Sequence, residues 1–492
     1  MKGKKLQSKL NSNSLSLFYA KTVANINMNI RELKSAEEIK KFLEYSDIDY
    51  VKVAITDIDG ILRGKYMHSE KFIKSSKMGF GFCDVIFGWD INDELYEFKN
   101  ISRDKPFTGW HSGFPDVKTL IVPNSGRVNP FEKNIPLFLA ELAEEEVCPR
   151  GVLKNILSKL EGEGIKSKSA FEYEFFLFNE TPDSIRDKKF KNLANFTPGM
   201  FGYSILRNSV HSDFYNKILN MCSDMDMPLE GLHTETGPGV FEAALMVDES
   251  INSADKASIF KTFTKVLCQK NNLMANFMAK WSDKYPGQSG HIHVSLEDSA
   301  GNPIFASSGE KFPDAYKYFI GGLQKYMREF SIMIAPTVNS YKRLCPGAWA
   351  PINMTWGIEN RTTAFRAIKG DSKSQRIENR LPGADSNPYL ALAATLGAGF
   401  LGIEEKIIPT AETIGGAYDL KLEKKYQVPA NLAEAAYLFK ESEAASNLFG
   451  EKFVKHFANT RIWEYQEYKK KSNFLNSSKI TPWELERYFE VI

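Results

Sequence analysis

The sequence is poor in cysteine and has almost no net charge. Its 492 residues include five cysteines, at positions 83, 148, 222, 268 and 345, with no C-x-x-C pair. This odd, scattered set provides neither a disulfide framework nor a zinc cage, so we expect a reducing, cytoplasmic location. The 63 lysines and arginines nearly balance 61 aspartates and glutamates. No basic surplus directs the chain to nucleic acid or a membrane, and its partner is expected to be small.

A membrane span and a phosphate-binding loop are also missing. The longest uncharged run, 386–403, is rich in Ala and Gly and begins with Asn387 and Pro388, the signature of a helix buried in protein. It contains Gly397-Ala-Gly399-Phe-Leu-Gly402, formally a dinucleotide motif. The motif lies inside a helical pattern rather than after a strand, which argues against a dinucleotide site. No G-x-x-x-x-G-K-[ST] sequence occurs.

Acidic residues are absent from positions 1–31, which hold five lysines and one arginine. We interpret this segment as a disordered extension, with a transit peptide as the alternative. Translation from Met28 is a further alternative, because the first amphipathic stretch follows it.

The remaining chain divides into two predicted domains, 32–145 and 146–492. In the first, a helix precedes a hairpin of strands 50–55 and 61–66 around Asp59-Gly60, and a further strand spans 119–122. Asp57-x-Asp59-Gly60 also resembles the start of a calcium loop, but the other ligand positions are missing, which favours a turn. In the second domain we expect helices at 150–161, 253–270, 312–329, 387–404, 431–447 and 482–490, the last one opened by a Thr481 capping box.

Three strand-like segments carry ionisable residues at alternate positions, on one face of each strand. These pairs are Glu172 and Glu174, His291 and His293, and Arg376 and Arg380 on either side of Glu378. For Glu172 and Glu174 alone, a solvent-facing strand is an alternative explanation. Two further carboxylates, Glu235 and Glu242, bracket a Gly-Pro-Gly turn.

Such a set of carboxylates would repel one another without cations among them, and oxygen-rich ligands favour Mg²⁺ or Mn²⁺ over zinc. Arginines are dense nearby, at positions 343, 361, 366, 376 and 380, together with Lys373. Arginines beside a divalent-metal site are what phosphoryl transfer requires.

Taken together, these segments resemble the glutamine synthetase family. The motifs that carry the resemblance are Glu172-Tyr-Glu174, Glu235 to Glu242, Ser289-Gly-His291-Ile-His293, Asn339 to Gly347, Glu359 to Arg366 and Arg376-Ile-Glu378-Asn-Arg380. The resemblance covers about residue 35 to the C-terminus. It implies an α+β fold with a small N-terminal β-grasp domain, a larger catalytic domain with a curved antiparallel sheet, and a homo-oligomeric ring with active sites between subunits.

The resemblance also implies residue roles. Glu174, Glu235 and Glu242 match ligands of one metal, and Glu172, His291 and Glu378 match ligands of the other. Glu230, His293, Ser295, Lys373 and Arg376 match positions that contact ATP. Gly287, Arg343 and Arg380 match the glutamate site, and Arg361 and Arg366 match positions that meet the transferred phosphoryl group. Asp84 matches loosely an aspartate supplied to the ammonium site of a neighbouring subunit.

The implied reaction is ATP- and Mg²⁺-dependent formation of a γ-glutamyl amide from glutamate and ammonia or a small amine, through a γ-glutamyl phosphate. The family's flap glutamate is replaced here by Trp349, which provides an indole and a π face but no base. Val240 and the shorter Gln288-Ser-Gly-His291 segment depart from the family pattern near the same pocket. The changes leave the second substrate open between ammonia and an amine, and Trp349 favours an organic amine.

Two other functions remain open for the sequence: a non-catalytic structural or regulatory member of the family, and a two-metal hydrolase. Tyr418-Asp419-Leu420 also resembles the adenylylated segment of some bacterial members. An ordinary surface tyrosine is the competing interpretation.

Overall fold

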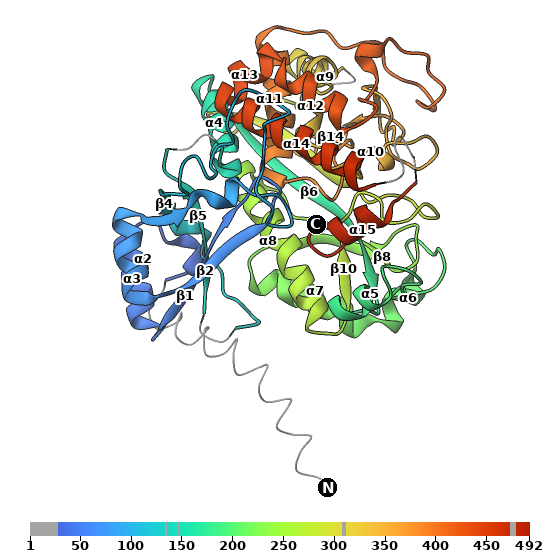
Figure 1. The fold of residues 1–492 in the computed structure, drawn as a ribbon. Coiled ribbons are helices and arrows are strands. Elements are labelled where there is room, and N and C mark those ends of the chain that lie inside the picture. The colour runs from blue at the N-terminus through green and yellow to red at the C-terminus, as the bar shows by residue number, and fades with distance from the viewer. Residues whose placement is uncertain (1–27, 133–134, 145–146, 308–310, 473–478) are drawn as a thin grey trace.

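The computed structural model describes residues 28–492 except 133–134, 145–146, 308–310 and 473–478 (Figure 1). The first of its two sheets has the order β2-β1-β5-β4-β3, in which β1 and β5 are parallel and the other neighbours antiparallel. Its strands are β1 (Tyr50–Thr56), β2 (Leu62–His68), β3 (Phe80–Cys83), β4 (Asp116–Ile121) and β5 (Leu137–Leu142).

Two helices, α2 (Ala36–Tyr45) and α3 (Ser69–Met78), cover one face of this sheet (Figure 1). Phe42 and Phe72 from these helices pack with Val51, Val53 and Phe138 of β1 and β5 in a separate small core. This is the predicted β-grasp arrangement. Residues 1–27 of the predicted extension and residues 145–146 at the predicted domain boundary lie outside the described residues, so those divisions stay predictions.

The hairpin predicted at Asp59-Gly60 is confirmed, since β1 and β2 pair in register from Tyr50 opposite His68 to Thr56 opposite Leu62. Asp57 Oδ1 accepts the backbone N–H groups of Asp59 and Ile61, at 3.0 and 2.9 Å. Its Oδ2 accepts from Arg63 at 2.9 Å. The Asp57 carboxylate therefore stabilises the turn.

The second sheet has the order β12-β13-β14-β11-β6-β8-β7, and its neighbours are antiparallel except for β12 and β13. Its strands are β6 (Ile165–Phe178), β7 (Leu229–Thr234), β8 (Val240–Leu245), β11 (Gly290–Asp298), β12 (Trp356–Ile358), β13 (Phe365–Ile368) and β14 (Arg376–Asn379), with β9 (Asp248–Glu249) and β10 (Met274–Asn276) paired to β6 outside this order. The expected curved, largely antiparallel sheet is confirmed.

Helices surround the second sheet, and several of them fill the upper part of the molecule in Figure 1. They are α4 (Pro149–Gly162), α5 (Pro182–Asp187), α6 (Ile205–Val210), α7 (Ser212–Asp224), α8 (Ser250–Gln269), α9 (Asp314–Tyr326), α10 (Ser340–Arg343), α11 (Pro388–Glu404), α12 (Leu432–Lys440), α13 (Glu443–Phe449), α14 (Glu451–Lys471) and α15 (Pro482–Tyr488). The short 3₁₀ turns are η1 (Ile30–Glu32), η2 (Asp84–Phe87), η3 (Pro123–Ser125), η4 (Ser331–Met333) and η5 (Lys424–Tyr426).

Most predicted helices are present, and the Thr481 capping box at the start of α15 is confirmed. The single helix predicted at 431–447 is wrong, because the chain breaks into α12 and α13 where Ser442 caps the second helix through the N–H of Ala445. The long helix α14 was not predicted. None of the helices in the described part of the chain has the length and apolar character of a membrane span.

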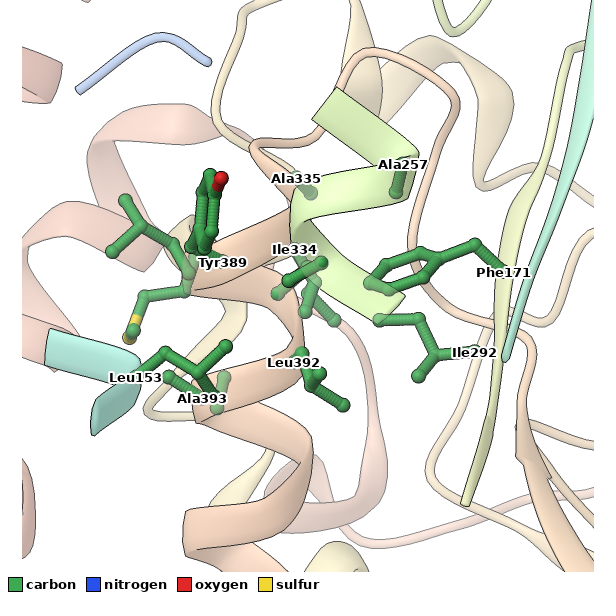
Figure 2. Packing of buried hydrophobic residues seen from close by; sticks show 14 of the residues in the cluster. Leu153, Phe171, Ala257, Ile292, Ile334, Ala335, Tyr389, Leu392 and Ala393 are labelled. Atoms are coloured by element: carbon green, nitrogen blue, oxygen red, sulfur yellow. The ribbon is translucent and has the colours of Figure 1, made fainter. Parts of the chain in front are cut away.

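Figure 2 shows why the two faces of the second sheet differ. Phe171 on β6 and Ile292 on β11 point toward Ala257 of α8 and toward Ile334, in a core that also contains Leu392 of α11. Because side chains alternate along a strand, Glu172 and Glu174 lie on the opposite face of β6. The hydrophobic face thus fixes which side of the sheet carries the ionisable residues.

The glycines of the formal dinucleotide motif are packing residues of α11. A Cβ on Gly402 would lie 2.1 Å from the Tyr318 carbonyl oxygen of α9, and one on Gly399 would lie 2.1 Å from the Phe319 ring. A Cβ on Gly397 would meet Leu448 at 2.5 Å. The glycines allow α9 and α13 to approach α11 closely, which supports the interpretation against a nucleotide-binding loop.

We expect Gly402→Ala to lower the free energy of unfolding by about 1–3 kcal/mol, because the backbones of α9 and α11 must move apart to admit the methyl group. Chemical denaturation monitored by circular dichroism measures this effect. Gly416→Ala is the matched control, since nothing lies within 4 Å of a Cβ at Gly416. Equal stability of the two variants would contradict the packing role.

Candidate active site

The register of the second sheet aligns the predicted site residues across neighbouring strands. Glu174 of β6 lies opposite Glu242 of β8, and Glu172 lies opposite His291 of β11. Glu378 of β14 lies opposite His293 on one side and Arg366 of β13 on the other. Residues that are more than two hundred positions apart, such as Glu172 and Glu378, thus share one face of the sheet.

This face forms the floor of a cavity of about 440 Å³. All six residues matched to metal ligands line it, as do the three residues matched to the glutamate site, Trp349, and both arginines matched to the phosphoryl group. The complete lining is Glu172, Glu174, Tyr203, Glu235, Thr236, Glu242, Pro286, Gly287, Ser289, His291, Arg343, Ala348, Trp349, Ala350, Arg361, Arg366, Glu378 and Arg380.

One group of ligand atoms combines Glu172, His293 and Glu378, all within 4.8 Å of one another. His293 Nε2 lies 3.1 Å from Glu172 Oε2, whereas His291 Nε2 lies 4.0 Å from Glu378 Oε1. Burial opposes ionisation of Glu172, but the His293 imidazole outweighs it and lowers the Glu172 pKa to about 2. The structure therefore places His293, predicted to contact ATP, in this group with Glu172 and Glu378.

The second group combines His233, Glu235 and Glu242, also within 4.8 Å of one another. His233 Nε2 lies 3.1 Å from Glu242, and its Nδ1 lies 3.6 Å from Glu235. Burial, followed by the negative charge of Glu172, raises the pKa of Glu242 to about 11.

Glu174 lies partly buried beside this second group and accepts hydrogen bonds from the backbone N–H and hydroxyl of Ser289, at 2.6 and 2.7 Å. Burial still raises the pKa of its carboxyl group. Burial and the neighbouring negative charges oppose ionisation of Glu174 and Glu242. A cation would offset both effects, and this set of carboxylates with imidazoles among them is suited to Mg²⁺ or Mn²⁺. The residues present thus fit the divalent cations that the family uses.

Arginines line the part of the cavity around Glu378. Arg366 donates to Glu378 at 2.8 Å, and Arg380 also pairs with Glu378. Arg343 is buried and donates to the carbonyl oxygens of Leu381 and Arg380, at 2.9 and 3.1 Å. Burial lowers the Arg343 pKa to about 10, so the guanidinium remains charged at neutral pH. This side of the cavity can hold carboxylate and phosphate oxygens.

Some predicted site residues lie outside the lining of this cavity. Arg376 is near it, because its Nε donates to Nδ1 of His293 at 3.2 Å. Glu230 and Lys373 are exposed, and Ser295 lies farther along β11, opposite Lys168. Asp84 is buried in η2, where it accepts a hydrogen bond from Thr108 at 2.7 Å. The roles predicted for these five residues stay predictions.

The structure adds residues that the sequence analysis assigned no role. His233 belongs to the second group, and its ring stacks on Tyr203 at 4.4 Å between centroids. His233 of β7 lies two positions before Glu235, and this spacing could have identified it. Tyr203 lies on a loop far upstream, and no local pattern marks it. An ordinary surface tyrosine is one interpretation of Tyr418 from the sequence. In the structure this residue is only partly exposed, and its hydroxyl is buried.

Comparisons with known proteins show which proteins this chain is similar to. The family model described as the glutamine synthetase catalytic domain matches residues 146–488. Type-1 glutamine synthetase 2 of Dictyostelium discoideum is 40% identical over 472 residues, which are 94% of this chain and 88% of that protein. A glutamate–isopropylamine ligase of a Pseudomonas species is 34% identical, covering 94% of this chain and all of the relative.

Among solved structures, one described as GmaS without ligand superposes with a TM-score of 0.74 at 25% identity, covering 91% of this chain and 98% of that one.

Proposed function

Because this chain belongs to the glutamine synthetase family, we propose that it is an ATP- and Mg²⁺-dependent ligase that joins the γ-carboxylate of glutamate to a small alkylamine. The observation that carries the proposal is the arrangement of the cavity. Six acidic and imidazole side chains line it together with four arginines, and Arg366 and Arg380 pair directly with Glu378: the six are Glu172, Glu174, Glu235, Glu242, His291 and Glu378, and the arginines are Arg343, Arg361, Arg366 and Arg380. A site of this kind suits transfer of a phosphoryl group to a carboxylate.

Two different anions are proposed to bind to different arginines. Buried Arg343 and Arg380 are proposed to hold glutamate, while Arg361 and Arg366 neutralise charge on the transferred phosphoryl group. The glutamate γ-carboxylate attacks the terminal phosphorus of ATP, the bond to ADP breaks, and an acyl phosphate forms. The amine then attacks the acyl carbon, and phosphate leaves with formation of the amide. Divalent cations, held by the two carboxylate–imidazole groups, would supply charge neutralisation of the phosphates.

The acceptor is proposed to be an alkylamine because of the groups on the open side of the cavity. Trp349 lines it with 63% of its surface exposed, and Tyr203 lines it beside Glu235. A carboxylate can pair with an alkylammonium while aromatic faces pack on the alkyl group and attract the cation. The 34% identical relative named for isopropylamine supports an alkylamine, whereas the 40% identical relative is named a glutamine synthetase.

An assay of ADP formation with ATP, Mg²⁺, glutamate and a panel of acceptors tests the proposal. We expect methylamine, isopropylamine or ethanolamine to give a higher kcat/KM than ammonium. Trp349→Glu is expected to reduce this preference by about tenfold, because it removes the aromatic face and adds a carboxylate that can bind ammonium.

Tyr437→Glu is a suitable control, because Tyr437 is 52% exposed on α12 and does not line the cavity. A higher kcat/KM for ammonium than for every alkylamine would contradict the proposed acceptor, but the proposed ligase reaction would still hold. ATP hydrolysis without an amide product would favour a two-metal hydrolase instead. Absence of Mg²⁺-dependent ATP turnover would favour the non-catalytic alternative. The ring assembly, with Asp84 completing a neighbouring site, is a further part of the proposal.

Binding of Mg²⁺ should release protons at neutral pH. Because the pKa of Glu242 is raised to about 11, this carboxyl group is protonated at pH 7 in the metal-free protein and must ionise to bind a cation. Affinity for Mg²⁺ should therefore rise with pH, up to about tenfold per unit, below that pKa. Titration calorimetry in buffers of different ionisation enthalpy measures the proton count. Glu242→Gln should release about one proton fewer, and equal release by both proteins would contradict the assignment.

A further inference from the structure

A second cavity, of about 220 Å³, lies where the β1–β2 turn meets α8 and the last two residues of the sequence. Ile61, Leu62 and Val266 give it apolar walls, and two lysines of α8, Lys261 and Lys265, also line it. Lys261 lies 5.9 Å from the centroid of the Tyr173 ring, on the helix-covered face of β6. The cavity is thus on the side of the sheet opposite Glu172 and Glu174, and it shares no lining residue with the active site.

Lys261 is buried and Lys265 partly buried, and neither has a carboxylate within ion-pair distance in the described part of the chain, although the charge of Asp385 acts on Lys261 and that of Glu490 on Lys265. Lys261 Nζ donates to the carbonyl oxygen of Ser386 at 3.2 Å, and Lys265 Nζ donates to that of Val491 at 2.6 Å. Within the described ranges, neither lysine forms an ion pair with a side chain. Asp59 also lines the cavity, but its carboxylate pairs with Arg461 at 2.7 Å.

Buried charges in proteins are normally paired, and the charges of Asp385 and Glu490, which make no ion pair with the two lysines, do not offset their burial. Burial lowers the pKa of Lys261 to about 8, and burial together with the charge of Lys261 lowers that of Lys265. An ammonium group carries three N–H donors, and each lysine directs one to a backbone carbonyl. Further donors therefore remain for a ligand in the cavity that both residues line.

We propose that this cavity binds a small oxyanion between the ammonium groups of Lys261 and Lys265. A carboxylate or phosphate group would accept hydrogen bonds from both lysines and compensate their charge. Ile61, Leu62 and Val266 would pack against a short hydrocarbon body, which a carboxylate ligand can provide and inorganic phosphate cannot. The site is independent of the ligase reaction, because none of its residues belongs to the machinery described above.

Titration calorimetry on the full chain, at constant ionic strength, tests the proposal with isobutyrate and with inorganic phosphate as probes. We expect Lys265→Met to weaken binding of at least one probe by about tenfold or more, since a charge-assisted hydrogen bond and a counter-ion are lost. Lys270→Met, an exposed position at the end of the same helix, should leave the affinity unchanged. Binding of isobutyrate alone identifies a carboxylate site, and binding of phosphate alone identifies a phosphate site.

The arginines of the active site also attract these anions, so Arg343→Met is the second control. It should retain the Lys265-dependent binding. Loss of all binding in Arg343→Met, an unchanged affinity in Lys265→Met, or no binding of either probe would overturn the proposal. If Lys265→Met does not fold, anomalous diffraction from selenate-soaked crystals of the unaltered protein decides. A selenium peak beside Lys261 and Lys265 supports the site, and its absence contradicts it.

Discussion

Replacing Glu378 by glutamine is expected to lower kcat/KM for amide formation by about 10³-fold. Glu378 is 1% exposed and lies at the centre of the site, where Arg366 and Arg380 pair with its two oxygens. Burial opposes its ionisation, but the charges of Arg380 and His293 outweigh this effect and lower its pKa to about 2. The carboxylate is thus ionised throughout the working pH range. Glutamine keeps the shape but removes the charge that a cation and two guanidinium groups require.

Steady-state kinetics with the best acceptor and a titration of Mg²⁺ would measure this loss. Glu297→Gln is the matched control, because Glu297 lies on β11 of the same sheet but pairs with Lys168 at 2.7 Å, away from the cavity. The control should keep full activity. Glu378→Gln activity within tenfold of the unaltered enzyme, with the fold intact by circular dichroism, would contradict a central role for this carboxylate.

The floor of the active site could be predicted because strand alternation needs only local sequence. Glu172 and Glu174, or His291 and His293, fall on one strand face whatever the rest of the chain does. Which histidine approaches which carboxylate depends on the register between strands and on side-chain rotamers. The structure accordingly brings His293, rather than His291, to 3.1 Å from Glu172. Tyr203 lies on a loop, where no periodic pattern exists, and sequence reasoning could not find it.

Among the helices, too, those with local sequence signals could be predicted, whereas one that depends on distant partners could not. The helix α11 could be predicted from its Asn387 N-cap, Pro388 and apolar content. The helix α14 buries His456, Asn459, Arg461 and Glu464 along with its apolar residues, so no polar face marks it in the sequence. Those polar residues are buried because distant segments provide their partners. His456 lies 3.0 Å from the carbonyl oxygen of Phe87, and Glu464 pairs with Arg487.

The most consequential of these partnerships for stability is that of Arg461 with Asp59. Arg461 Nη1 lies 2.7 Å from Asp59 Oδ1, and Arg461 also donates to the Tyr96 hydroxyl at 3.1 Å and to the Pro336 carbonyl at 3.3 Å. The side chains of Arg461 and Asp59 are 2% and 7% exposed. One guanidinium thus connects the β1–β2 turn and the segment after η2 to the helices of the larger unit.

Arg461→Met should therefore lower the free energy of unfolding by about 3–5 kcal/mol, because it leaves the Asp59 carboxylate buried without a counter-charge. Thermal and urea denaturation would measure the loss. The double variant Asp59→Asn with Arg461→Met should recover much of it, since the uncompensated charge is then absent. If the double variant were as unstable as Arg461→Met alone, the cost would arise from lost packing of the arginine stem and its hydrogen bonds to Tyr96 and Pro336. If the double variant instead recovers stability, the buried ion pair between Arg461 of α14 and Asp59 is what attaches the first sheet to the helices.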